Sequence, residues 1–67
     1  MSEKVDVRLL TRLEVEDQFG ISKRFLELAV RRGDGPPIVR IGRSVRYRAS
    51  DIYKWIDAQI EGGAHEA

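Results

Sequence analysis

The sequence contains no cysteine and a single histidine. Without cysteine the chain can form no disulfide bond, no thiolate nucleophile and no cysteine metal site. The histidine, His65, stands in a Gly-Gly-containing C-terminal stretch with no second ligand or nucleophile nearby. Paired carboxylates and a nucleophile–base pair are also missing from the pattern. We therefore expect no enzymatic activity, no catalytic residue, no cofactor and no metal.

Long hydrophobic runs are also missing. No apolar run approaches the length of a membrane span, and Met1-Ser2-Glu3-Lys4 does not open a signal peptide. We therefore expect a cytoplasmic protein with no membrane partner. The chain has 67 residues, so it forms one domain at most, close to the lower limit for a self-sufficient core. Its hydrophobic content of 42% favours a folded chain over a disordered one.

Net charge is nearly zero, but the charges are unevenly distributed. Residues 1–21 carry −2, residues 49–67 carry −3, and residues 22–48 carry +6. The basic segment holds two acids and eight cations, which are Lys23, Arg24, Arg31, Arg32, Arg40, Arg43, Arg46 and Arg48. A neutral chain with one strongly basic segment has the electrostatic character of a protein that binds a polyanion.

A first helix is predicted over residues 12–19. Thr11 and Glu14 have the spacing of a capping box, and Leu10 with Val15 has that of a hydrophobic staple. Gly20 then offers a residue that adopts positive φ at low cost. Only about two residues separate this helix from the next one. The two helices must therefore pack at a steep angle, as in a helix-turn-helix.

A second helix is predicted over residues 23–32, between the N-cap Ser22 and Gly33 at the C′ position. Its buried edge is a narrow apolar stripe at i, i+3 and i+4, formed by Leu26, Ala29 and Val30. The residues left facing outward are Lys23, Arg24, Glu27, Leu28 and Arg31. Such a face suits a reader of duplex nucleic acid. From this helix alone, a solvated charged face fits equally well.

A hairpin follows the loop Asp34-Gly35-Pro36-Pro37, with strands over 38–41 and 45–48. A two-residue loop, Gly42-Arg43, would pair Ile41 with Ser44 and Arg40 with Val45 and mix the two faces. A three-residue loop, 42–44, pairs Ile41 with Val45, Val39 with Tyr47 and Arg40 with Arg46. We prefer this register because it separates an apolar face from a basic one. The two opposed arginines repel each other by roughly 0.2–1 kcal/mol. A phosphate backbone against this face would explain them, and the alternative is an edge charged against aggregation.

A third helix is predicted over residues 51–60, capped by Ser50-Asp51. Its apolar residues repeat at helical spacing and form a core stripe of Ile52, Trp55, Ile56 and Ile60. The whole pattern predicts a mostly helical α+β winged helix-turn-helix over residues 9–60. A flexible arm over 1–8 and a disordered tail over 61–67 flank it.

The sequence resembles the small phage excisionase and AlpA-type regulators, within the wider MerR-like winged helix-turn-helix group. The resemblance covers Leu9 to Gln59. It rests on Leu10-Thr11, Glu14-Val15, Phe19-Gly20-Ile21-Ser22, Arg32-Gly33, Val39-Arg40-Ile41-Gly42-Arg43, Tyr47-Arg48, Ser50-Asp51 and Trp55. Two positions depart from the family pattern. Glu16 stands where a small residue is usual, and Glu27 stands where an aromatic or basic residue is frequent.

The resemblance implies sequence-specific binding of double-stranded DNA without catalysis. Such proteins act as excisionases or as transcriptional regulators of a phage or integrative element. The implied partners besides DNA are an integrase or recombinase and further copies of the chain, with no small-molecule ligand. The location implied is the cytoplasm, at the nucleoid. The implied recognition-helix residues are Ser22, Lys23, Arg24, Glu27 and Arg31, and the implied wing residues are Arg40, Arg43, Ser44, Arg46 and Arg48.

The mechanism we expect places the second helix in the major groove, N-terminal end first. The helix dipole and Ser22 would favour a phosphate there. The competing interpretation is a protein-interaction module that uses the winged-helix surface, with Leu28 as its anchor and no DNA binding. The dependence of affinity on salt separates the two.

Overall fold

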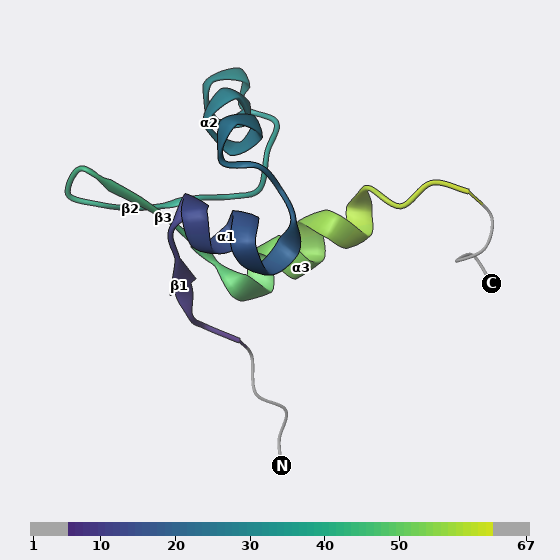
Figure 1. The fold of residues 1–67 in the computed structure, drawn as a ribbon, viewed down its shortest axis with the longest axis horizontal. Helices are drawn as coiled ribbons and strands as arrows, with labels where there is room; N and C mark the ends of the chain where they lie inside the picture. Colours follow the sequence, from purple (N-terminus) through teal and green to yellow (C-terminus); the bar gives the residue numbers. More distant parts are fainter. Residues whose placement is uncertain (1–5, 63–67) are drawn as a thin grey trace, which may run out of the picture.

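Within residues 6–62, which the computed structural model describes, three helices pack against a small antiparallel sheet (Figure 1). The elements in chain order are β1 (Leu9–Leu10), α1 (Arg12–Phe19), α2 (Lys23–Arg32), β2 (Val39–Ile41), β3 (Ser44–Arg48) and α3 (Ala49–Ala58). The strand order is β1-β3-β2. The predicted α+β winged helix-turn-helix architecture is confirmed. Residues 1–5 of the expected arm and 63–67 of the expected tail, His65 included, lie outside the described residues.

The first two helices have the predicted bounds and the predicted caps. The Thr11 hydroxyl accepts from the Glu14 N–H at 3.1 Å, and the Glu14 carboxylate accepts from the Thr11 N–H at 2.8 Å. The Ser22 hydroxyl accepts from a first-turn N–H of α2 at 3.0 Å. Both helices end at a left-handed glycine, Gly20 and Gly33. The capping residues and terminal glycines, which act within a few residues, therefore set the bounds of α1 and α2.

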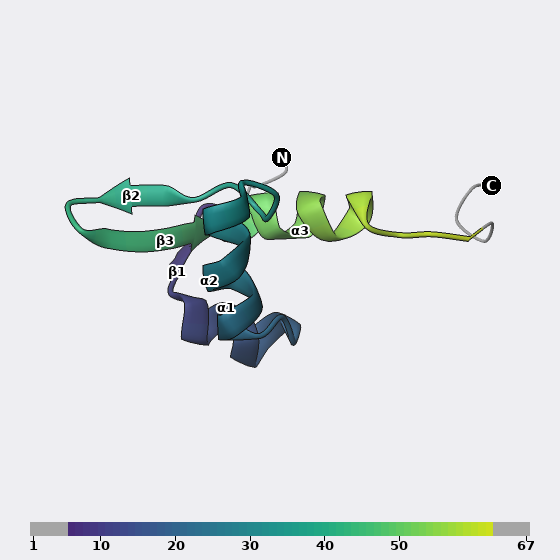
Figure 2. The same ribbon diagram turned by 90° about the horizontal axis from the view of Figure 1, so that it is seen from above.

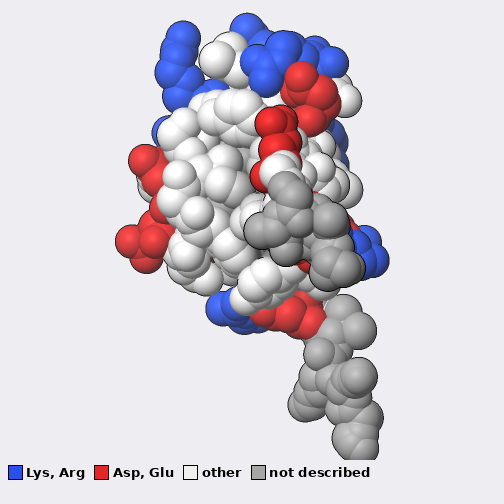
Figure 3. Space-filling view, turned by 90° about the vertical axis from the view of Figure 1, so that its right-hand side faces the viewer, with Lys and Arg blue, Asp and Glu red and all other residues white. Residues whose placement is uncertain are grey.

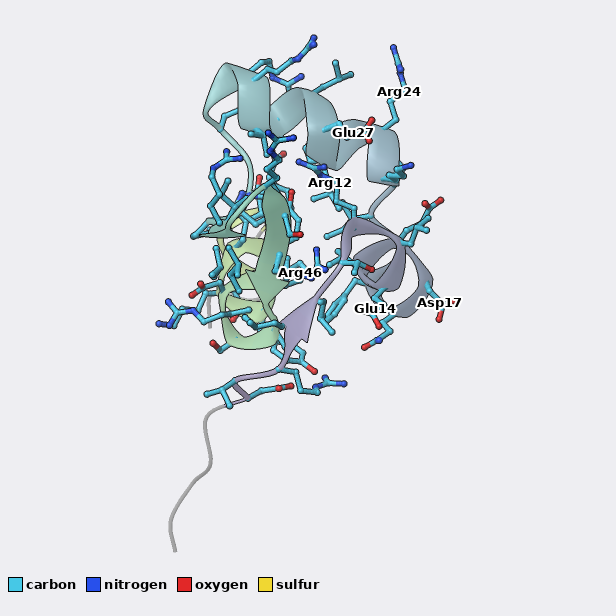
Figure 4. The ribbon with its side chains drawn as sticks, turned by 90° about the vertical axis from the view of Figure 1, so that its left-hand side faces the viewer. Arg12, Glu14, Asp17, Arg24, Glu27 and Arg46 are labelled. Atoms are coloured by element: carbon cyan, nitrogen blue, oxygen red, sulfur yellow. The ribbon has the colours of Figure 1, made fainter. Side chains whose placement is uncertain are left out.

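The core lies where α1, α2 and the start of α3 meet β1 and β3. Its fully or almost fully buried residues are Leu10, Val15, Leu26, Ala29, Tyr47, Ala49 and Ile52. The helices α1 and α2 cross steeply, as Figure 1 and Figure 4 both show. The hairpin of β2 and β3 projects from one side of this body, and α3 extends on the other side (Figure 2). The hairpin is therefore a wing whose turn projects from the body, while Tyr47 near the end of β3 belongs to the core.

The predicted register of the hairpin is wrong. The strands are joined by two residues, Gly42-Arg43, and the opposed pairs are Ile41 with Ser44, Arg40 with Val45, and Val39 with Arg46. Gly42 has a φ of 60° and no residue other than glycine has a positive φ among the described residues. This is the pattern of a type II′ turn, whose twist matches that of paired strands. The geometry of the two-residue turn therefore sets the register, rather than the separation of apolar from basic side chains.

The observed register divides the arginines between the two faces of the wing. Directly opposed residues of an antiparallel pair lie on one face, so Arg40 shares a face with Val45 and the buried Tyr47. Alternation along β3 places Arg46 and Arg48 on the other face. The single basic face that we predicted does not exist.

The first strand, β1, has no counterpart among the predicted elements. It pairs with β3, with Leu9 opposite Arg48 and Leu10 opposite Tyr47. Two residues are too few for a strand pattern, and Leu10 also serves as the predicted staple residue. Pairing with a distant strand is what makes this segment extended.

The third helix runs over 49–58 rather than 51–60. The N–H groups of Ala49 and Ser50 donate to the carbonyls of Arg8 and Asp6, at 3.0 and 3.1 Å. These bonds satisfy two of the donors that a helix start leaves unpaired. The helix therefore begins two residues early and without the side-chain cap that we predicted from Ser50-Asp51.

The predicted apolar stripe of α3 is only partly buried. Ile52 is fully buried, and Trp55 and Ile56 are half-buried. The Trp55 ring lies 5.9 Å from that of Phe25, centroid to centroid. Ile60 lies beyond the end of α3 and is 47% exposed, so its assignment to the core stripe is wrong.

Candidate nucleic-acid interface

An open groove of about 510 Å³ lies between α2 and the wing. The start of α1 contributes to its lining. The lining residues are Arg12, Arg24, Glu27, Leu28, Val30, Arg31, Arg40 and Val45. Four of them, Arg24, Glu27, Leu28 and Arg31, follow one another at i, i+3, i+4 and i+7 along α2, which places them on one helix face.

Burial of the opposite edge of α2 orients this face. Leu26 and Ala29 are 0% and 1% exposed, so they hold the helix against the core. The residues predicted to face outward are thereby turned toward the groove or the solvent. Lys23 is exposed and forms an ion pair with Glu27 at 3.9 Å. Arg24 projects outward from the first half of α2 (Figure 4).

The wing contributes one of its arginines to the groove. Arg40 lines the groove beside Val45, as its register position requires. Arg43 is exposed at the turn. Among the predicted wing residues, the structure therefore brings Arg40 next to α2 and places Arg43 at the tip of the wing.

The remaining predicted wing residues, Ser44, Arg46 and Arg48, belong to the outer face of the wing. Arg46 donates to the carbonyl of Val45 at 3.0 Å. Arg48 donates to the carboxylate of Asp51 at 3.0 Å. None of these three residues lines the groove beside the predicted face of α2.

Arg12 is a groove residue that the sequence analysis missed. Its guanidinium donates to the Tyr47 hydroxyl at 3.4 Å, and it lies with Glu27 in the space between α2 and the rest of the domain (Figure 4). Arg12 and Tyr47 are 35 residues apart in the sequence. Their contact depends on how α1 packs against β3, and no local pattern signals it.

The groove has a net charge of +3, from four arginines and Glu27. Within residues 6–62 none of these four arginines forms an ion pair. The pairs present there are Arg8 with Asp6, Lys23 with Glu27, Arg32 with Asp34 and Arg48 with Asp51. On the side of the molecule away from the wing, basic side chains also gather at the end where α2 lies, with acidic side chains beside them (Figure 3). The charge of the groove arginines is therefore available to an anionic ligand.

Two acidic side chains of α1 lie away from the groove. Glu14 and Asp17 project from α1 on the side away from α2 (Figure 4). Arg32 is also outside the groove, because it pairs with Asp34 at 3.1 Å and lies 5.7 Å from the centre of the Phe25 ring. The groove side of the domain is thus more basic than the overall charge suggests.

Glu16 joins the two helices of the motif. From the sequence, it could tilt outward or pair with Arg12. Its side chain is exposed, and its carboxylate accepts from the backbone N–H of Lys23 at 3.2 Å. An acid from α1 thus caps the first turn of α2, alongside Ser22. It occupies the end of the helix where we expected a phosphate, so it competes with that contact.

No group of three or more His, Asp or Glu side chains within 6–62 is arranged to hold a metal ion. No helix of that part of the chain has the length and apolar character needed to cross a bilayer.

The fold agrees with a comparison against known protein families. A family described as "Helix-turn-helix domain" matches residues 9–60. Comparison with curated proteins and with solved structures gave no match. The matching family includes small DNA-binding proteins of the AlpA and excisionase type, and a helix-turn-helix domain indicates DNA binding. The match covers nearly all of the described residues, and the chain therefore belongs to this helix-turn-helix domain family.

Proposed function

We propose that the chain binds a specific double-stranded DNA sequence, with α2 in the major groove and the wing on the neighbouring backbone. The observation that carries this proposal is the groove in which the i, i+3, i+4, i+7 face of α2 meets Arg40 and Arg12. Its arginines have no acidic partner within residues 6–62. Four unpaired guanidinium groups around an open groove suit phosphates and the acceptor atoms of guanine.

The role that we propose for each of these residues follows from its position on α2 or on the wing. Arg24 and Arg31 lie one turn to either side of the centre of the α2 face, so they reach base edges or the flanking phosphates. Arg40 and Arg43 hold the backbone beside the wing. Lys23 and Ser22 lie at the N-terminal end of α2. A phosphate that contacts this end either displaces the Glu16 carboxylate from the Lys23 N–H or binds beside it.

The biological role that we propose is that of an excisionase or a transcriptional regulator of a phage or integrative element. The family match supports this role, because the family includes such proteins. One domain of this size buries on the order of 600–1,000 Å² on DNA. Binding at the nucleoid would then involve several copies, with an integrase or recombinase as partner in the excision role. The MerR-like grouping is part of the same proposal.

Salt dependence tests the proposal. If about five cations neutralise phosphates, the logarithm of the association constant falls with the logarithm of salt concentration, with a slope of about −4 to −5. Fluorescence anisotropy with a labelled duplex, from dilute buffer to moderate salt, measures this slope. A folded sample that binds no DNA in dilute buffer contradicts the proposal.

Footprinting on the DNA that flanks the gene separates the two roles. Protection of direct repeats beside an attachment site supports excision control, whereas protection of a promoter supports transcriptional regulation. The competing function, a protein-interaction module anchored by Leu28, predicts weak salt dependence. The surroundings of Leu28 disfavour it, because this residue lies in a groove lined by four arginines.

A further inference from the structure

The centre of the groove face of α2 is occupied by residues that do not suit a phosphate. Glu27 and Leu28 are adjacent, both are half-buried, and both line the groove. Arg24 precedes them by about one turn and Arg31 follows them by about one turn. The two arginines are thus separated by about 10 Å along the helix axis, roughly three base-pair steps.

Glu27 suits a ligand that offers a hydrogen-bond donor. Its carboxylate lies 3.9 Å from the Lys23 ammonium and receives no hydrogen bond within the described residues. A phosphate at this position would be repelled. Among the groups that a duplex presents in the major groove, the cytosine N4 amino group is the donor that a glutamate accepts from.

Leu28 requires an apolar group from its ligand. The polar edges of most bases would leave its side chain without a partner. The thymine C5-methyl group is the apolar feature of the major groove. The cytosine amino group and the thymine methyl group both lie on the pyrimidine edge that faces the major groove. Adjacent side chains on one helix face therefore suit neighbouring pyrimidines.

We propose that Glu27 and Leu28 form a pyrimidine-reading pair. Glu27 selects a cytosine through its amino group, and Leu28 selects a neighbouring thymine through its methyl group. This inference rests on the proposed DNA-binding function and deepens it. It assigns the choice of two neighbouring pyrimidines to Glu27 and Leu28, and it leaves guanine edges and phosphates to the flanking arginines.

Removal of one methyl group from the DNA tests the Leu28 contact directly. The full chain first selects its site from a randomised duplex pool, and we expect a cytosine and a thymine at neighbouring positions. The selected thymine is then replaced by deoxyuridine, which lacks only the methyl group. Burial of one such group corresponds to about 0.8 kcal/mol, so we expect about a fourfold loss of affinity.

Two variants provide the matched comparison. Leu28→Ala is expected to be insensitive to the deoxyuridine replacement. Leu13→Ala keeps the fourfold loss, because Leu13 is 62% exposed on α1 and does not line the groove. Circular dichroism checks that both variants are folded. The comparison of thymine and deoxyuridine duplexes with the wild-type chain tests the Leu28 contact even if a variant does not fold.

Replacement of the acid tests the Glu27 contact. Glu27→Gln is expected to lose the preference for cytosine and to gain one for adenine, because glutamine pairs with the adenine N6 and N7 atoms. The same selection experiment measures the change. An unchanged preference in Glu27→Gln overturns the assignment of this residue.

The possible outcomes distinguish a failure of the pyrimidine-reading pair from a failure of the proposed DNA binding. A wild-type chain that binds no DNA overturns both. A chain that selects a sequence without neighbouring pyrimidines overturns the pair alone. A wild-type chain whose affinity is unaffected by deoxyuridine at each selected thymine also overturns the pair alone.

Discussion

The two faces of the wing carry similar residues but use them differently. On the outer face, Arg46 donates to a carbonyl of its own strand and Arg48 pairs with Asp51. On the groove face, Arg40 forms no ion pair within residues 6–62 and lies across from the face of α2 that carries Arg24. The number of arginines in a segment therefore does not locate a binding surface. What distinguishes the groove is that its arginines lie together and have no acidic partner within residues 6–62.

The largest expected effect comes from the groove side. Arg24→Ala is expected to weaken binding to the specific site by about 1–3 kcal/mol, because an arginine that pairs with a guanine edge contributes discrimination of that size. Binding to random duplex DNA falls much less. Anisotropy titrations with the two duplexes at one salt concentration give both values.

The outer-face variant Arg46→Ala is the control for this prediction. Arg46 is matched to Arg24 in side-chain type and net charge change, but it lies outside the groove. We expect its losses to be small on both duplexes. Equal losses for Arg24→Ala on specific and random DNA would show that α2 does not read the sequence at this position.

The second prediction concerns the turn that keeps the two faces apart. Gly42 has a φ of 60°, and an added Cβ would meet no atom within 4 Å. Gly42→Ala therefore costs backbone energy alone, about 1–2 kcal/mol in the free energy of unfolding. Chemical denaturation measures the loss. Arg43→Ala, at the neighbouring turn position without a positive φ, should leave the stability nearly unchanged.

The hairpin also shows where prediction from sequence ends. A shift of one residue in the register moves every side chain to the other face. Separation of apolar from basic residues favoured the three-residue loop, whereas the structure has the two-residue loop. A glycine at the first position of the two-residue loop Gly42-Arg43 favours a type II′ turn, and this local signal decides the register. The helices 12–19 and 23–32 were predictable, because capping boxes and C-terminal glycines act within a few residues.

The candidate site was predictable mainly where it depends on α2, since Arg40 was also predicted but from a register that the structure does not have. Burial of Leu26 and Ala29 follows from periodicity, so the outward face of α2 follows as well. The position of Arg12 and the early start of α3 depend on contacts between distant segments, such as the N–H of Ala49 with the carbonyl of Arg8. Patterns within one segment carry no information about such contacts.

The third prediction compares the two faces of the wing directly. Arg40→Ala is expected to weaken binding to any duplex by about 1 kcal/mol or less and to reduce the salt slope by about 1, because one phosphate contact is lost. Arg46→Ala is expected to leave the slope unchanged. Titrations of both variants at several salt concentrations provide the comparison. If the two variants behave alike, the observed register does not decide which arginine reaches DNA.

The smallest effect is expected at Arg48, which stands at the end of β3. Its guanidinium is 53% exposed and pairs with Asp51, whose side chain is 13% exposed. An ion pair with one solvated partner contributes about 0–1 kcal/mol to stability, so Arg48→Ala should lower the unfolding free energy only slightly. Its effect on DNA affinity should be below about 0.5 kcal/mol, because the charge is already neutralised.

Asp51→Asn separates the effect on stability from the effect on DNA affinity, since it releases the Arg48 charge without removing it. If the outer face lies far from the duplex, Asp51→Asn leaves the salt slope unchanged. A steeper slope would place Arg48 within reach of phosphate, and the contrast between the two faces would then rest on the ion pair alone.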